Sequence, residues 1–215
     1  DMELVGPRQR FYHVAGTNGK GSTGAFMESL LRASGERTGL FTSPHLVSWC
    51  ERIQVQGKMI PEHEADAGIH CIRSLVAEWA PHPTFFELTM LLALDWYERS
   101  GAEHIVLETG MGGRWDATNA LKPVVTVLTP IGLDHQQWLG ETLAEIAAEK
   151  AGIIKPGVPV VSAAQAPEAE AVIRAAAQAA GAELHFITEP WQGALPFAGP
   201  HQGWNAALAI AALRA

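Results

Sequence analysis

Residues 15–22 read Ala15-Gly-Thr-Asn-Gly-Lys-Gly-Ser22, between a short apolar run at 11–15 and a helical pattern at 22–33. This order of strand, glycine-rich turn and helix is the setting of a phosphate-binding loop, because small residues let backbone N–H groups surround a phosphate. The helix N-terminus adds its positive dipole end, and Lys20 adds a mobile positive charge. Ser22 or Thr23 supplies a hydroxyl near a bound Mg²⁺. The stretch therefore predicts a nucleotide-binding α/β domain.

The same stretch departs from the usual pattern G-x-x-x-x-G-K-[ST]. Val14 stands where the first glycine is expected, and Gly21 separates Lys20 from Ser22. The alternative is a glycine-rich turn that carries an ordinary surface lysine. Because strand, glycines, lysine, hydroxyl and helix follow one another in order, the phosphate loop is favoured.

Apolar runs alternate with helical patterns along the rest of the chain. The predicted strands are 38–41, 104–108, 124–128, 158–162 and 183–187, with a hairpin over 53–60 that turns at Gln56-Gly57. The predicted helices are 61–79, with Pro61 at its first position, 85–97, 142–150, 168–180 and 205–214. Apolar strands separated by helices indicate parallel β-α-β units. The predicted fold class is α/β, a three-layer α/β/α P-loop-type domain with a mostly parallel central sheet.

Length and composition narrow the function classes. The chain has 215 residues, which is the size of one large domain, and a formal net charge of −8, which argues against sequence-independent nucleic-acid binding. Its two cysteines, Cys50 and Cys71, form no zinc or disulfide pattern and suit a reducing cytoplasm. No apolar run approaches the roughly 20 residues that span a bilayer. We expect a cytoplasmic protein with no nucleic-acid or membrane partner.

Further candidate residues follow other predicted strands. Glu108 ends the strand at 104–108 and precedes Thr109-Gly-Met-Gly-Gly113, so it is placed where a Mg²⁺ ligand belongs beside a phosphate loop. His135 follows the strand at 124–128, and either a ligand or a surface role remains open. Lys150 lies in the last turn of a helix, where the macrodipole alone favours a lysine. The residues by themselves predict a Mg²⁺-nucleotide enzyme and leave its second substrate open.

Six ordered segments together resemble one known family. They are Gly16-Thr-Asn-Gly-Lys-Gly-Ser22, Thr42-Ser-Pro-His-Leu46, Leu107-Glu-Thr-Gly-Met-Gly-Gly-Arg-Trp-Asp-Ala-Thr-Asn119, Leu133-Asp-His135 with Leu139-Gly140, Glu149-Lys-Ala-Gly-Ile-Ile-Lys155, and His201-Gln202 with Asn205. In this order they resemble the folylpolyglutamate synthase/dihydrofolate synthase family of the Mur-ligase superfamily. The resemblance implies an ATP-dependent amide ligase of folate biosynthesis and one-carbon metabolism. In such enzymes ATP phosphorylates a substrate carboxylate, and the amine of L-glutamate then displaces phosphate from the acyl phosphate.

The resemblance also implies roles for individual residues. The residues that contact ATP are then Thr17, Asn18, Gly19, Lys20, Gly21, Ser22 and Asn205. Ser43 and Glu108 bind one Mg²⁺ and His135 a second one. Lys20, His135 and Lys150 are the catalytic residues, and Lys150 matches a family lysine that is carbamylated.

The acceptor site is implied in the same way. The segments that line the pterin site in family members match Thr84, Phe85, Phe86, Glu87, Trp115, Asp116 and Ala117. Two aromatic side chains suit a flat heterocycle by stacking, although core packing is the alternative for Phe85 and Phe86, and we expect it for at least one. Thr109, Met111 and Trp115 differ from the residues more usual in the family, which affects the shape of this pocket. The implied partners are a pterin or folate and L-glutamate, and the protein is expected to be a monomer.

The family also has a C-terminal Rossmann-like domain, for which this chain leaves no room after the helix at 205–214. We therefore expect residues 1–215 to be the Mur-ligase-type central ATP-binding domain, with the glutamate-ligase domain absent from the chain. The stretch 191–201 is also short for the family. Two alternatives remain: a Mur-type cell-wall amino-acid ligase, which the segments 42–46 and 116–119 disfavour, and a nucleotide-binding module without catalysis.

Overall fold

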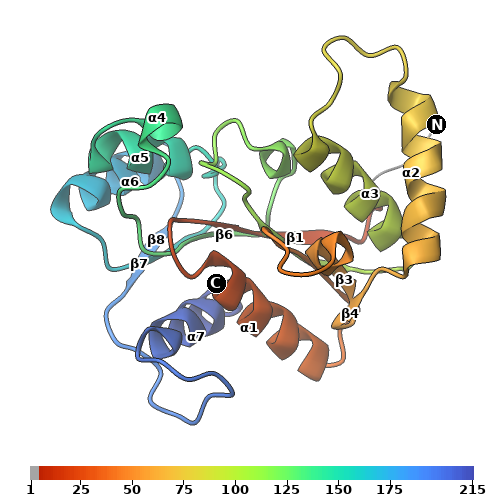
Figure 1. Cartoon of the computed structure of the whole chain (residues 1–215). Coiled ribbons are helices and arrows are strands. Elements are labelled where there is room, and N and C mark those ends of the chain that lie inside the picture. Colours follow the sequence, from red (N-terminus) through yellow and green to blue (C-terminus); the bar gives the residue numbers. More distant parts are fainter. Residues whose placement is uncertain (1–4) are drawn as a thin grey trace.

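The computed structural model describes residues 5–215 and contains one sheet of eight strands, in the order β4-β3-β2-β5-β1-β6-β7-β8 (Figure 1). The strands are β1 (Arg10–Ala15), β2 (Thr38–Phe41), β3 (Ile53–Val55), β4 (Lys58–Met59), β5 (His104–Glu108), β6 (Val125–Leu128), β7 (Val160–Ala163) and β8 (Leu184–Ile187). The six strands from β2 to β8 in that order pair in parallel, and only β3 and β4 are antiparallel. The predicted mostly parallel sheet is confirmed.

Helices cover both faces of the sheet. They are α1 (Lys20–Ala33), α2 (Glu62–Val76), α3 (Phe85–Arg99), α4 (Gln136–Leu139), α5 (Leu143–Ala151), α6 (Pro167–Ala179) and α7 (His201–Ala212), with short 3₁₀ helices η1 (Trp49–Arg52) and η2 (Ala117–Ala120). Figure 1 shows α1 and α7 side by side below the sheet, with α2 and α3 above one half of it and α5 and α6 above the other. The predicted three-layer α/β/α architecture is confirmed.

The alternation of side chains along the strands explains this arrangement. On β5, Val106 faces the core that contains α1 and α7, whereas Ile105 and Leu107 face the core that contains α2 and α3. Successive residues of a strand point to opposite faces, so a continuous apolar strand requires a helical layer on each side. A third core lies between β6, β7 and the helices α5 and α6.

The predicted hairpin at 53–60 is confirmed as β3 and β4. Gln56 and Gly57 both have positive φ, 52° and 69°. A two-residue turn with positive φ at both positions matches the twist of the strands it joins, and glycine adopts it without steric strain. This hairpin closes one edge of the sheet, next to β2.

Several predicted boundaries are wrong by a few residues. Pro61 is the N-cap of α2, with an extended ψ of 142°, rather than its first helical residue. The strand predicted at 158–162 begins only at Val160, because Pro159 has no N–H to donate to the sheet. α7 begins at His201, one turn earlier than predicted. Within residues 5–215, no helix combines the length and the apolarity needed to cross a membrane.

Candidate active site

The candidate site lies at the carboxyl edge of the sheet, where three central strands end together. β1 lies between β5 and β6, with Val14 opposite Glu108 and Ala15 opposite Leu128. The loop after β1, the carboxylate of Glu108 and the segment after β6 therefore meet at one place. In parallel α/β sheets this edge, at the strand order reversal, is where ligands bind.

The glycine-rich loop forms the N-terminal boundary of α1. Gly19 is the N-cap with a left-handed φ of 87°, and no side chain caps the first amides of the helix. A Cβ on Gly19 would lie 2.4 Å from Oδ1 of Asn205, so the absence of a side chain lets α7 bring Asn205 over the loop. Asn205 is 3% exposed and donates to Oε1 of Gln202 at 3.0 Å. The structure thus places Asn205 next to the loop.

The front part of the loop is tied to the segment after β6. The amides of Thr17 and Asn18 donate to the carbonyl of Pro130 at 3.0 and 3.3 Å. Oγ1 of Thr17 donates to the carbonyl of Gly132 and accepts from its amide. In this conformation those two amides are engaged within the protein. The uncapped amides at the start of α1, among residues 20–22, are better placed to bind an anion than those of Thr17 and Asn18.

Two lysines converge on one carbonyl of the loop. Nζ of Lys20 donates to the carbonyls of Gly16 and Thr17 at 3.2 and 3.3 Å, and Nζ of Lys150 donates to that of Gly16 at 2.8 Å. Lys150 is 2% exposed, so the macrodipole explanation, which suits a surface lysine, is wrong for this residue. Burial lowers the pKa of Lys150 to about 8, and the positive charge of Lys20 acts in the same direction while Asp134 opposes it.

Glu108 and Ser43 come together beside this loop. Glu108 is 4% exposed and its Oε2 accepts the amide of Ser43 at 3.0 Å. Burial raises the pKa of Glu108 to about 7, although the Ser43 amide and the charges of Lys20 and Arg52 act in the opposite direction. A Cβ on Gly21 would lie 3.4 Å from Oε2, so the carboxylate reaches the first turn of α1.

His135 is placed differently from the other predicted ligands. It has a left-handed φ of 49° just before α4, and its half-exposed side chain lies 3.6 Å from Oδ2 of Asp134. Among residues 5–215, no three His, Cys, Asp or Glu side chains cluster closely enough to hold a metal ion. His135 and Glu108 therefore do not form part of one such cluster. A Glu carboxylate with nearby hydroxyls still suits Mg²⁺, which binds proteins through one or two carboxylates and keeps waters and phosphate oxygens.

The first predicted acceptor segment lies at the start of α3. Thr84 and Glu87 form a capping box, in which each side chain bonds the other's backbone. Phe86 packs edge-on against Phe41, with ring centroids 5.5 Å apart, and therefore belongs to the core. Phe85 is exposed and lines an apolar cavity of about 540 Å³ between α2 and α3. The expectation that one of the two rings serves packing is confirmed.

The second predicted acceptor segment surrounds Asp116. Trp115 is 88% exposed, whereas Ala117 packs against the core at the start of η2. Oδ2 of Asp116 accepts the amides of Gly110 and Met111 at 2.8 and 3.0 Å, in the loop that follows Glu108. The carboxylate thus holds the loop next to the site.

Arg52 also lies near Glu108 and Phe85, although no pattern in the sequence predicts it there. Its guanidinium lies 5.3 Å from the centroid of the Phe85 ring, its Nε donates to Nδ1 of His45, and its charge lowers the pKa of Glu108. Arg52 ends η1, before the antiparallel edge of the sheet, and no motif marks it. Only the pairing of β2 with β3 brings it to Glu108.

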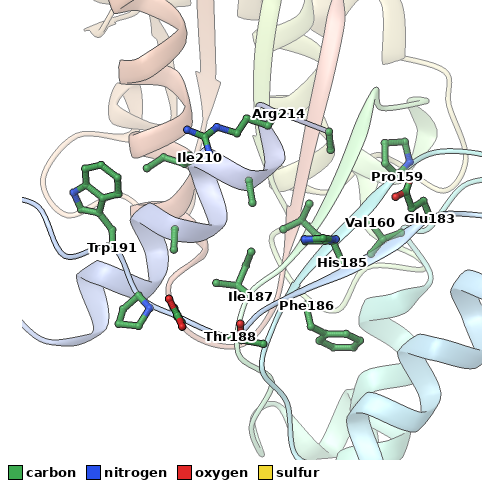
Figure 2. Close-up of a pocket in the computed structure, with 16 residues that line it drawn as sticks. Pro159, Val160, Glu183, His185, Phe186, Ile187, Thr188, Trp191, Ile210 and Arg214 are labelled. Carbon is green, nitrogen blue, oxygen red and sulfur yellow. The ribbon is translucent and has the colours of Figure 1, made fainter.

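A cavity of about 660 Å³ lies elsewhere, between α7 and the strands β7 and β8. Figure 2 shows His185 and Ile187 of β8 facing it, with Trp191, Ile210 and Arg214 around it. None of the predicted site residues lines this cavity. This cavity is therefore separate from the predicted site residues at the carboxyl edge of the sheet.

Comparison with known proteins identifies the family of the chain. The family model of the Mur ligase middle domain matches residues 14–186. A dihydrofolate synthase/folylpolyglutamate synthase of Bacillus subtilis is 45% identical over 177 residues, which cover 77% of this chain and 40% of that protein. The enzyme of the same name from Escherichia coli is 37% identical over 230 residues, covering 100% and 54%. The chain spans about half or less of the length of these relatives.

Solved structures of folylpolyglutamate synthases also resemble this chain. A Mycobacterium tuberculosis folylpolyglutamate synthase complexed with ADP superposes with a TM-score of 0.90 at 34% identity, covering 98% of this chain and 55% of that one. A structure described as an FPGS–AMPPCP–folate complex gives 0.88 at 32% identity, covering 98% and 59%. The similarity extends over nearly all of the present chain.

Proposed function

Because the chain belongs to the Mur ligase family, as its middle domain, we propose that it is the ATP-binding domain of an enzyme that ligates L-glutamate to dihydropteroate, to reduced folates or to both. Its relatives carry the names of those two activities, and its structural neighbours hold ADP, AMPPCP and folate. The observation that carries the proposal is the meeting of Lys20, Lys150 and Glu108 around one glycine-rich loop.

The start of α1 is proposed to hold the ATP phosphates. Its uncapped amides and dipole attract an anion, and Lys20 can turn from the carbonyls of Gly16 and Thr17 to a phosphate. Asn205, which lies over Gly19, is proposed to contact the nucleotide. The positive charge then stabilises the transferring phosphoryl group, because phosphoryl transfer depends mainly on positioning and charge neutralisation.

Magnesium is proposed to bind at Glu108 and the hydroxyl of Ser43, with a second ion near His135. The ion supplies charge neutralisation on the phosphates when bound. A dication there would favour the ionised form of Glu108, whose pKa burial raises to about 7. Glu108 is in this way suited to an acquired cation rather than to a permanent ion pair.

Lys150 is proposed to carry a carbamate. An amine with a pKa of about 8 is partly neutral at physiological pH, and a neutral amine can attack CO₂ to form N-carboxylate with release of one proton. The nitrogen keeps one N–H, which can still donate to the carbonyl of Gly16. The new carboxylate reverses the charge beside Lys20 and provides a further oxygen ligand for a cation.

The acceptor is proposed to bind between the starts of α3 and η2. Phe85 offers an exposed aromatic face beside Arg52, and Trp115 offers a second one. Thr84, Glu87 and Ala117 shape the two segments, and Phe86 supports them from the core. The carboxylate of Asp116 holds the loop that follows Glu108 by accepting the amides of Gly110 and Met111. Aromatic faces of this kind suit a pterin ring.

The remainder of the reaction requires residues beyond this chain. We propose that a second, C-terminal domain completes the glutamate site, since the relatives are about twice as long. We further propose a cytoplasmic monomer. The unpaired Cys50 and Cys71 and the use of ATP support the compartment, and light scattering of the complete protein tests the oligomeric state.

ADP release by the complete protein tests the function. The assay contains Mg-ATP and L-glutamate, with 7,8-dihydropteroate, with a reduced folate, or with neither. Turnover with both acceptors means a bifunctional enzyme, and turnover with one defines the substrate. If the folded protein binds ATP and shows no acceptor-dependent turnover, the ligase proposal is wrong, and a cell-wall precursor is the next acceptor to assay.

A further inference from the structure

Buried polar side chains connect β1 to the loop that follows Glu108. His13 lies in the middle of β1, 1% exposed, opposite Leu107 on one side and Thr126 on the other. Its Nε2 lies 2.7 Å from Oγ1 of Thr118 in η2. Burial lowers the pKa of His13 to about 3, helped by the charge of Lys155, so the imidazole is neutral at physiological pH.

The hydrogen bonds fix where the protons lie. Oγ1 of Thr118 is 2.6 Å from Oδ1 of Asp116, and an ionised carboxylate can only accept, so the threonine hydroxyl donates its single proton to Asp116. The threonine oxygen must then accept from His13, which therefore carries its proton on Nε2. Nδ1 of His13 is buried and has no partner among residues 5–215. The imidazole thus acts toward Thr118 as a donor.

The other end of the chain of hydrogen bonds holds the loop beside the site. Oδ1 of Asp116 also accepts the amide of Thr118, and Oδ2 accepts the amides of Gly110 and Met111. The ring of Phe86 lies 2.6 Å from where a Cβ of Gly110 would be, so the loop rests directly on this aromatic side chain. A rotation of the Asp116 carboxylate would break the hydrogen bonds that hold the amides of Gly110 and Met111.

We propose that His13 and Thr118 are positioning residues, which orient Asp116 and thereby hold the loop 109–113 in the shape that binds the acceptor. The inference rests on the acceptor site proposed above. His13 is buried, and it acts on the loop through two hydrogen bonds in series, to Thr118 and from Thr118 to Asp116. A donor without charge suits this task, because its hydrogen bond does not change with pH in the physiological range.

Thr118→Val tests the proposal, because it removes the hydroxyl and keeps the shape. We expect the amides of Gly110 and Met111 to exchange with solvent about tenfold faster in hydrogen-exchange mass spectrometry. In the complete protein the KM for the acceptor should rise about three- to tenfold, with the KM for ATP unchanged, since the two hydrogen bonds that the variant loses, to His13 and to Asp116, both lie on the acceptor side. Thr118→Ser should restore the wild-type exchange rates of the loop and the wild-type KM for the acceptor.

Two further variants separate positioning from folding. Thr126→Val removes another buried hydroxyl next to His13, on β6, and should change neither the exchange of the loop nor the acceptor KM. His13→Gln keeps a donor near the position of Nε2, and should retain more acceptor affinity than His13→Phe. If His13→Phe does not fold, Thr118→Val still decides the question.

Unchanged exchange at Gly110 and Met111 in folded Thr118→Val would overturn the proposal, as would an equal rise of both KM values. The exchange measurement is independent of the reaction catalysed. A wild-type protein without acceptor-dependent turnover therefore refutes the proposed function, while the exchange data still show whether the hydrogen-bond chain holds the loop.

Discussion

Glu108 and Lys150 carry opposite charges in water, and burial drives both toward their neutral forms. The pKa of Glu108 rises to about 7 and that of Lys150 falls to about 8. Both groups therefore change protonation close to physiological pH, and both lie near Lys20. Groups with pKa values shifted in this way are concentrated at functional sites.

Glu108→Gln should remove a pH dependence of stability from the ligand-free protein. The folded pKa of about 7 lies above the ordinary value of 4.5 for a glutamate carboxyl, so this group stabilises the fold fully below pH 4.5, and the stability is lost as pH rises through 7. The loss amounts to about 3 kcal/mol across this interval. Urea unfolding at pH 5 and pH 8 measures it. The interpretation fails if the variant and the wild type lose equal free energy of unfolding between these two values.

Lys150→Met should lower kcat at least about 100-fold, because the methionine keeps an unbranched stem and removes the nitrogen that would carry the carbamate. Wild-type turnover should fall in buffers freed of CO₂ and recover with bicarbonate, whereas the variant should not respond. The variant also leaves the carbonyl of Gly16 with Lys20 as its donor, so a stability loss of about 1–3 kcal/mol is expected. A wild-type rate that is independent of CO₂ contradicts carbamylation.

Single residues were predicted with uneven success. Glu108 was placed correctly because its position at the end of a buried strand is itself visible in the sequence. The burial of Lys150 was not predicted from the residues alone, since its position in a last helical turn also fits a surface lysine, and the carbonyl that it contacts, that of Gly16, lies 134 residues away. The position of Arg52 likewise depends on a strand pairing that a local pattern cannot reveal.

Helices α1 and α7 meet at Gly19, and a side chain there should separate them. Gly19→Ala places a Cβ 2.4 Å from Oδ1 of Asn205, so nucleotide affinity should fall at least about tenfold. Gly157→Ala is the matched control, because Gly157 has a similar φ of 69° and no atom within 4 Å of the added Cβ. Isothermal titration with AMPPCP measures both. Equal affinities in the two variants would show that the approach of Asn205 does not matter for the nucleotide.

Elements were predicted best where local chemistry fixes them. The helix predicted over 142–150 begins at a capping box of Thr142 and Glu145, and the hairpin predicted to turn at Gln56-Gly57 has positive φ at both of these residues. The short elements η1, η2 and α4 were not predicted, because four residues are too few to show a period. α7 begins at His201 after an irregular stretch, and its first turn has no capping side chain to mark the boundary.

The 215-residue chain alone should bind Mg-ATP weakly and ligate little or no glutamate. It contains the loop, Glu108 and Lys150, and it spans about half or less of its relatives. We expect the complete protein to bind AMPPCP more tightly and to release ADP with acceptor, in the same calorimetric and coupled assays. Robust ligation by the purified 215-residue chain would contradict the proposed second domain.

The order of strands was the part of the whole molecule that the sequence left open. The alternation of apolar strands and helices predicts a parallel sheet, because each β-α-β unit must return to the same edge. This alternation does not predict that β1 lies between β5 and β6, or that β3 and β4 extend the sheet beyond β2. The two neighbours of β1 are chosen by side-chain packing between distant segments, since Arg10 pairs with His104 and Tyr12 with Val125. The candidate site depends on that choice, because it places Glu108 beside the phosphate loop.

The central place of β1 has a consequence for biosynthesis. β1 begins at Arg10, while its neighbours begin at His104 and Val125. At about 5–20 residues per second, a ribosome needs about 5 to 20 s after making β1 before its first sheet partner exists. During this time Phe11, Tyr12 and Val14 have no strand beside them, and the nascent chain presents an apolar segment to chaperones or to other nascent chains. The strand that leads into the glycine-rich loop is therefore made before both of its neighbours in the sheet.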